Sequence, residues 1–160
     1  LTDPKGWDAQ LKDEPALLIA VQRDVRLAVG KLSATHEWDL AGHLDWNLGN
    51  LRTSANLGGV WRLGKELPRD FGYRSRPTGA GGGSVFVFGD VHAVARDLFL
   101  DGNTWKSGPS VAKEPFVGEF GLGFDIDVNS LQLRVGHLWR SEEFETQHGS
   151  RGVWFFELAL

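Results

Sequence analysis

The sequence contains no cysteine, which excludes a disulfide framework and any thiol chemistry. It also lacks a run rich in lysine or arginine and carries a formal net charge of -4, so no nucleic-acid partner is expected. Its longest aliphatic run, Ala16 to Val21, is far shorter than the roughly 20 apolar residues of a membrane-spanning helix. These absences leave folds that depend on neither disulfides nor long apolar helices.

Glycine and aromatic residues, by contrast, are plentiful. Glycine supplies 21 of the 160 residues, about twice the usual share of ~7%. The chain also contains 7 tryptophans and 10 phenylalanines. Aromatic side chains suit a pleated surface, and glycine permits bends and close backbone approach within strands. The composition therefore favours β-strands over helices.

Alternation of apolar and polar residues is the strongest pattern in the chain. Near the first tryptophan-rich stretch, Trp38, Leu40 and Leu44 fall on one face, and Asp39 and His43 fall on the other. Such a period of two predicts a strand with one apolar face. The stretches that show it are 16–29, 38–48, 51–63, 85–96, 116–128, 131–140 and 153–160. The sequence thus predicts seven strands and no helix.

Strand length and the residues on the two faces distinguish a soluble β-sandwich from a transmembrane β-barrel. Strands of a soluble sandwich are usually only ~5–6 residues long, whereas the runs here, of about 8 to 14 residues, could cross a bilayer at a tilt. Arginines mixed with carboxylates on the polar faces suit mutual pairing inside a lumen. Aromatic residues near strand ends resemble an interfacial girdle: Trp38, Trp61, Trp139 and Trp154. We expect an all-β, antiparallel transmembrane β-barrel, with a soluble β-sandwich binding module as the alternative.

The strand count and the connections refine this prediction. Single-chain bacterial barrels have even strand numbers, because an open edge in lipid leaves backbone groups unpaired. An odd count, together with the missing methionine at position 1, predicts that residues 1–160 are the C-terminal part of one barrel domain. The connections over 100–115 and 141–150 fall on one side of the sheet. The long connection 64–83 falls on the other side, where turns should be short, so either it is unusual or the strand count is off by one.

Two polar features allow more than one interpretation. The stretch "LFLDGNTW", Leu98–Trp105, is either a surface loop that contacts substrate or lipid headgroups, or a rigid corner at a strand end. His43 lies on one face with Asp45, and Asp90 lies on one face with His92. A histidine and a carboxylate could together orient a general base, but salt bridges inside a lumen are the plainer explanation.

Four segments together resemble the lipid A 3'-O-deacylase family of Gram-negative outer membranes. They are "GWDAQLKDEP" (6–15), "NLGNLRTSANLGGVWRLGKELPRDFG" (47–72), "AVARDLFLDGNTW" (93–105) and "LWRSEEFETQ" (138–147). Their order makes the resemblance specific, and it extends from Gly6 to the C-terminus. One departure is Ala9, where the family tends to have asparagine.

The resemblance implies a fold, a reaction and a location. Members of the family are outer-membrane barrels of about twelve strands that hydrolyse the 3' acyloxyacyl ester of lipid A with calcium. Seven strands would be the second half of such a barrel. The implied partners are lipid A, or lipopolysaccharide, and the bacterial outer membrane.

The family's catalytic motifs are missing from this sequence. They are an Asn-Asp pair, a Thr or Ser, a Lys and a Gln-x-x-x-His pair, whose His precedes the segment corresponding to Gly6–Gln10. The isolated chain is therefore expected to be inactive, with the Ca²⁺ ligands outside it.

The polar segment at the start of the chain is the remaining candidate for a site. We expect five of its residues to shape the active-site cleft or to support a calcium site: Trp7, Asp8, Gln10, Asp13 and Glu14. The alternative is a loop tied to the rim of the barrel. A non-enzymatic barrel, porin-like or a surface protein, is the rival from another functional class.

Overall fold

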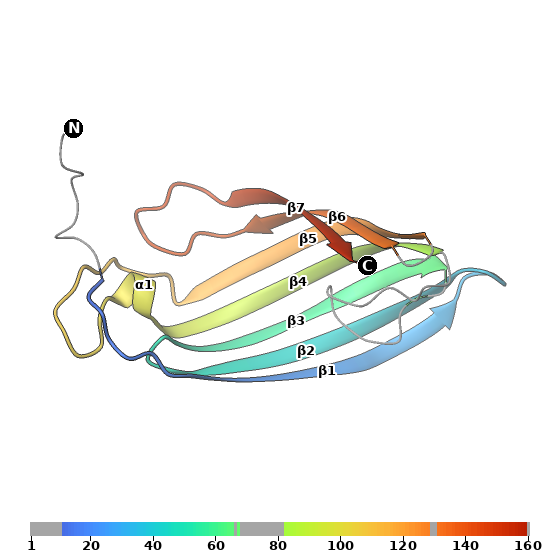
Figure 1. Ribbon diagram of the computed structural model, residues 1–160. Coiled ribbons are helices and arrows are strands. Elements are labelled where there is room, and N and C mark those ends of the chain that lie inside the picture. Colours follow the sequence, from blue (N-terminus) through green and yellow to red (C-terminus); the bar gives the residue numbers. More distant parts are fainter. Residues whose placement is uncertain (1–10, 66, 68–81, 129–130, 160) are drawn as a thin grey trace.

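The computed structural model describes residues 11–65, 67, 82–128 and 131–159. Within them, seven strands form a single antiparallel sheet in chain order, each paired with the next (Figure 1). The strands are β1 (Leu18–Lys31), β2 (Glu37–Gly49), β3 (Arg52–Lys65), β4 (Gly82–Asp97), β5 (Phe116–Val128), β6 (Leu131–Arg140) and β7 (Arg151–Ala159). The predicted all-β, antiparallel fold and its strand count are confirmed. A sandwich would require two packed sheets, so that alternative is wrong.

The strands are long, and their bounds follow the alternating stretches closely. They range from 9 residues in β7 to 16 in β4. One short element departs from the prediction that the chain has no helix: α1, Leu98–Asp101, forms a single turn directly after β4. Its cause is local, because the Asp97 side chain caps the turn by accepting a hydrogen bond from the Phe99 N–H at 3.0 Å.

The two ends of the sheet differ in which connections between strands lie there. Chain segments on both sides of α1 and the start of β1 lie at one end, called here the α1 end (Figure 1). Lys65 pairs with Gly83 at the opposite end. The connection between β3 and β4 therefore starts and finishes there, as the strand count predicted, and the count was not off by one. Apart from Leu67, that connection lies outside the described residues.

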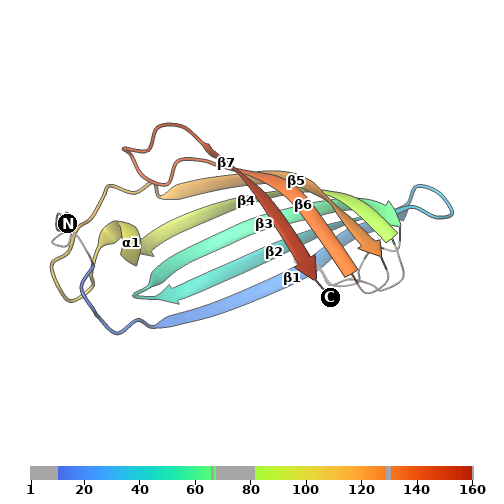
Figure 2. The ribbon, with the colours of Figure 1, turned by 45° about the horizontal axis from the view of Figure 1, so that its top comes forward.

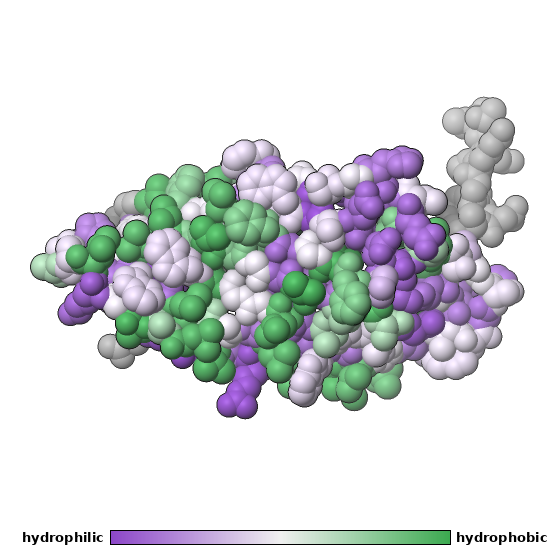
Figure 3. Space-filling view, turned by 180° about the vertical axis from the view of Figure 1, so that it is seen from behind, coloured by the Kyte–Doolittle hydropathy of each residue, from purple (hydrophilic) through white to green (hydrophobic). Residues whose placement is uncertain are grey.

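The sheet is bent, and its two faces have opposite character. Figure 2 shows β7 running obliquely to β1. Large apolar side chains on the outer face are exposed, as with Leu57 at 66% and Phe156 at 72%. Seen from behind, hydrophobic side chains cover a broad band, and hydrophilic ones gather towards the α1 end (Figure 3). Among the described residues, no helix has the length and hydropathy needed to span a bilayer.

An apolar cluster, called here the inner belt, crosses the middle of the inner face. It is formed by Ala41, Val60, Phe86 and Phe88, with Leu138 and Phe155 packed against it. The ring centroids of Phe86 and Phe155 lie 6.4 Å apart, although β4 and β7 are separated by three strand spacings, about 14 Å in a flat sheet. The bend of the sheet and the small residues between them, Gly123 and Gly136, allow these rings to meet.

Charged residues on the inner face pair with one another beyond the inner belt. Arg62, only 1% exposed, donates to both carboxylate oxygens of Asp39 at 2.9 and 2.7 Å. Arg134 likewise donates to Asp125 at 2.6 and 3.1 Å. Bidentate pairing of this kind satisfies charges that would be costly to bury alone. The predicted pairing of charges on the polar face is confirmed.

The inner belt gives a stability prediction. Phe86→Ala should lower the free energy of unfolding by about 3–5 kcal/mol, because it removes a fully buried aromatic ring and leaves a cavity. Leu57→Ala on the exposed outer face should have a much smaller effect. Urea titrations of the purified full-length protein test the difference, and equal losses for the two variants would contradict this description of the core.

Candidate functional site

Parts of all four segments that carry the family resemblance meet at the α1 end. The connections and the entering chain at that end are called here the rim, residues 11–17, 49–52, 97–115 and 141–150. Asn50, Asn103 and Glu143 come from three of the segments. The strap that enters the sheet, Leu11–Leu17, begins in the remaining segment, 6–15, and runs two residues beyond it. These segments are far apart in sequence. They meet because antiparallel strands that pair in chain order return the chain to the same end of the sheet at every second connection.

Two asparagine side chains hold the backbone of the strap. The Asn103 amide donates to the Lys12 carbonyl at 2.7 Å and accepts from the Lys12 N–H at 2.9 Å. Asn50 makes the same two-way arrangement, accepting from the Leu17 N–H at 2.7 Å and donating to the Pro15 carbonyl at 2.8 Å. Each side chain imitates the backbone of a neighbouring strand and satisfies groups that would otherwise depend on water.

The carboxylate of Glu14 fastens the strap to the loop after α1. Its oxygens accept from the Thr104 N–H at 2.9 and 3.0 Å and from the Trp105 N–H at 3.4 Å. Desolvation raises the pKa of Glu14, but these hydrogen bonds, with one from Asn103, outweigh it and hold the pKa below its ordinary value. The charged form of Glu14 is thus part of the fastening.

The loop after α1 is itself a fixed corner. Arg96 donates to the Gly102 carbonyl and to the Thr104 hydroxyl, both at 2.9 Å. Gly102 has a φ of +79°, and a Cβ there would stand 2.6 Å from the Pro109 carbonyl oxygen, so only glycine fits. Asp101 accepts from the Asp97 N–H at 2.7 Å. Of the two interpretations of "LFLDGNTW", these contacts support the rigid corner.

Asp101 also ties the corner to the chain that leads into β5. Its carboxylate contacts the Lys113 ammonium at 2.5 Å. Desolvation raises the pKa of Asp101, while the Lys113 ammonium and the Asp97 N–H hold it below its ordinary value. Lys113 in turn forms a short antiparallel bridge with Phe144. The two long connections of the rim are therefore one hydrogen-bonded unit.

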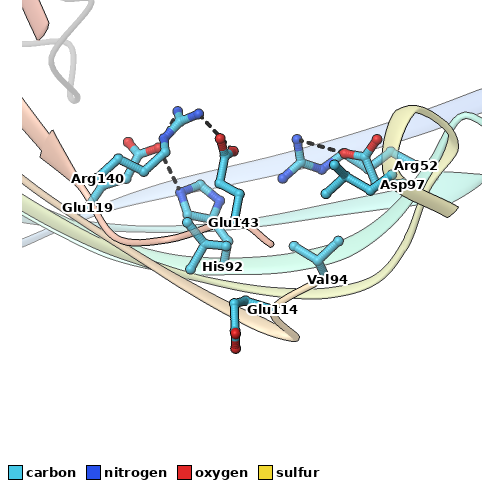
Figure 4. Close-up of a pocket in the computed structure, with 10 residues that line it drawn as sticks. Arg52, His92, Val94, Asp97, Glu114, Glu119, Arg140 and Glu143 are labelled. Carbon is cyan, nitrogen blue, oxygen red and sulfur yellow. Dashed lines mark hydrogen bonds and ion pairs between the residues drawn. The ribbon is translucent and has the colours of Figure 1, made fainter. Parts of the chain in front are cut away.

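A charged cavity of about 70 Å³ lies beneath the rim on the inner face. Arg140 is placed between Glu119, which it contacts closely, and Glu143, at 3.2 Å (Figure 4). His92 Nε2 lies 3.5 Å from Glu119 Oε1. On the opposite side, the Arg52 guanidinium lies 3.9 Å from the Asp97 carboxylate. Such a cavity could bind a polar group, although each of these charges already has a partner of opposite sign.

A buried histidine–carboxylate pair crosses β3 near this cavity. His43 on β2 contacts the carboxylate of Asp90 on β4. The position between them is Gly58, where a Cβ would stand 2.1 Å from Asp90 Oδ1, so the contact requires glycine. His43 therefore pairs with Asp90 rather than Asp45, and the sequence spacing indicated the face but not the partner. The contact supports the salt-bridge interpretation of these residues.

The residues expected to form a site in the first segment fall into two groups. Trp7, Asp8 and Gln10 lie outside the described residues. Asp13 is exposed, and its backbone carbonyl accepts from the Lys106 ammonium at 2.5 Å. The Glu14 carboxylate accepts hydrogen bonds from the backbone N–H groups of Thr104 and Trp105. The described part of this segment is tied to the rim by hydrogen bonds. A role of the five residues in the cleft stays a prediction.

The described residues do not fit a calcium ion. No group of three His, Cys, Asp or Glu side chains among them is arranged to hold a metal. Calcium requires about six to eight oxygen ligands, whereas the carboxylates of Glu14, Asp101 and Glu119 each have partners within the protein. No step of chemistry is assigned to a metal held by this part of the chain.

Comparison with known proteins identifies the family. Residues 1–158 match the family described as "Outer membrane protein LpxR". The chain belongs to the LpxR family. The resemblance drawn from the four segments is thereby confirmed. No curated protein matches the sequence.

A solved structure shows the same fold. The chain is similar to LpxR from Salmonella typhimurium, with a TM-score of 0.74 and 16% sequence identity. The match covers 95% of this chain and 54% of that one, so the chain spans about half the length of that LpxR structure. The seven strands match the LpxR barrel fold, and the sheet is not closed within the described residues.

The fastening of the strap predicts a dependence on pH. Because the pKa of Glu14 is lowered in the folded protein, its contribution is fully present above its ordinary value of 4.5 and is lost as the pH falls through the lowered pKa. Hydrogen exchange of the 103–105 segment should be faster in Glu14→Gln than in the wild type at pH 7, and the difference should disappear in acid.

Glu145→Gln is the matched control, since this rim residue is exposed and its backbone N–H donates to the Ala112 carbonyl at 3.0 Å. It should leave exchange in the 103–105 segment unchanged. Equal exchange in the wild type and Glu14→Gln at pH 7 would show that the carboxylate does not fasten the strap.

Proposed function

We propose that the chain supplies wall and rim to an outer-membrane lipid A 3'-O-deacylase. The single observation that carries this proposal is membership of the LpxR family over residues 1–158. The proposal assigns lipid A as the substrate, a carboxylic ester as the bond that is hydrolysed, and the bacterial outer membrane as the location.

The two faces of the sheet support a location in a membrane. A transmembrane strand needs about 9–11 residues, and the strands here are 9 to 16 residues long. The outer face exposes large apolar side chains, while Arg62 and Arg134 are buried on the inner face with carboxylate partners. In water this arrangement would leave the apolar face without a partner. In lipid the outer face is solvated by acyl chains and the charges are sequestered.

The rim supplies the part of the protein that a lipid headgroup would reach first. The strap is fixed to the rim by hydrogen bonds of Asn50, Asn103 and Glu14. We assign to Trp7, Asp8 and Gln10 the shaping of the cleft, and we place the calcium ligands outside this chain.

Analysis of lipid A tests the proposal directly. The full-length gene product is expressed in Gram-negative cells that lack a 3'-deacylase, and their lipid A is examined by mass spectrometry. We expect loss of the 3'-linked acyl chains, with cells carrying an empty vector as the control. Unchanged lipid A in cells whose outer membrane contains the folded protein would reject the enzyme in favour of a non-enzymatic barrel.

A further inference from the structure

An apolar groove of about 530 Å³ lies on the outer face, directly below the rim. Its size falls within the range of ~300–1,000 Å³ that is typical of small-molecule sites. The residues that define it are Trp46, Leu48, Ala55, Ala93, Ala95 and Phe116. Trp46 and Leu48 form one wall, from β2, and Phe116 forms the other, from β5. The floor between them comes from β3 and β4.

The groove exists because small residues replace large ones at one end of β3 and β4. Farther along the same face, β3 carries Leu57 and Trp61 and β4 carries Val87 and Val91, all at least 36% exposed, on either side of the paired Gly59 and Gly89. In the groove these strands carry alanines instead.

A register shift between Thr53 and Ser54 also leaves Ala95 without a partner on β3. Such a bulge disrupts the ladder and bends the strand locally. The groove thus results from both the small side chains and the shifted pairing of β3 with β4.

The chemistry of the walls restricts what the groove can bind. Aromatic and aliphatic side chains dominate its lining, and the walls stand on strands three spacings apart, about 14 Å between backbones. A linear apolar ligand fits between Trp46 and Phe116, whereas a charged or strongly polar group would lose its hydration without gaining partners. The upper end of the groove continues into the rim through Pro115, whose carbonyl accepts from the Val94 N–H at 2.8 Å.

We propose that this groove binds one acyl chain of a lipid A molecule while the headgroup lies at the rim. This inference rests on the proposed function, because it takes the outer face to be in contact with the lipopolysaccharide leaflet. It extends that function by placing an acyl-chain site on the outer wall, in β2 to β5. The continuity of the groove with the rim favours a lipid whose headgroup reaches the rim over a ligand dissolved within the bilayer.

Photocrosslinking distinguishes this site from general contact with lipid. Phe116, in the groove wall, is replaced by p-benzoylphenylalanine in the full-length protein, and the lipid adducts formed in cells are identified by mass. Phe120 is the matched control position, since it is an exposed aromatic residue on the outer face of the same strand and stacks on Trp139 at 5.9 Å, outside the groove. We expect lipid A adducts to be several-fold more abundant at position 116 than at position 120.

Filling the groove provides a second test. Ala93 pairs with Phe116 across the sheet, so Ala93→Leu should reduce the lipid A adducts at position 116 to the level at position 120 and leave those at 120 unchanged. Equal yields at the two positions, or no effect of Ala93→Leu, would overturn the proposal. Adducts at position 116 dominated by phospholipid, or by a second copy of the protein, would overturn it as well. The mass of the adducts is measured without any turnover of lipid A. Lipid A adducts at position 116 in a protein that leaves lipid A intact would therefore reject only the deacylase activity.

Discussion

Backbone pairing in a nearly unbroken register determines which face of the sheet every side chain occupies. A slip of one residue would move Arg62 from its carboxylate partner to the outer face and bring Trp61 into the inner one. Breaking a buried charge pair in this way costs about 3–5 kcal/mol. The described pairings shift register at only two places, between Arg26 and Ala28 and between Thr53 and Ser54. The second shift lies directly below the rim, where it shapes the outer groove.

This register produces an inner face made of layers. A charged layer lies under the rim, the inner belt crosses the middle, and a second charged layer with Asp39 and Asp125 lies beyond it. In the layer under the rim, the glycine at position 58 lets His43 reach Asp90 across a strand. In the second layer, Arg62 and Arg134 pair directly with their carboxylates. The belt adds close packing to a face that would otherwise consist of polar contacts. The result is the reverse of a soluble sheet, with exposed apolar and buried charged side chains.

The sequence allowed the strands to be predicted because alternation reports directly on which side chains share a face. It could not show which distant residues meet. Glu14 and Thr104 lie 90 residues apart and contact only because the rim folds back on itself. His43 reaches Asp90 because position 58, between them, is a glycine. The alternation of apolar and polar residues gives no information about such a contact. Two segments recognised separately in the sequence, around Glu14 and around Asn103, are joined in the structure by direct hydrogen bonds.

We propose that the outer face of this sheet contacts lipid and that the inner face does not. Spin labels placed one at a time along β4 in the full-length protein, reconstituted in a bilayer, test it most directly. Accessibility to oxygen should be high at Val85, Val87 and Val91 and low at Ser84 and Phe86, because the first set is exposed on the outer face and the second is buried on the inner face. A uniform profile, or the opposite alternation, would contradict the account.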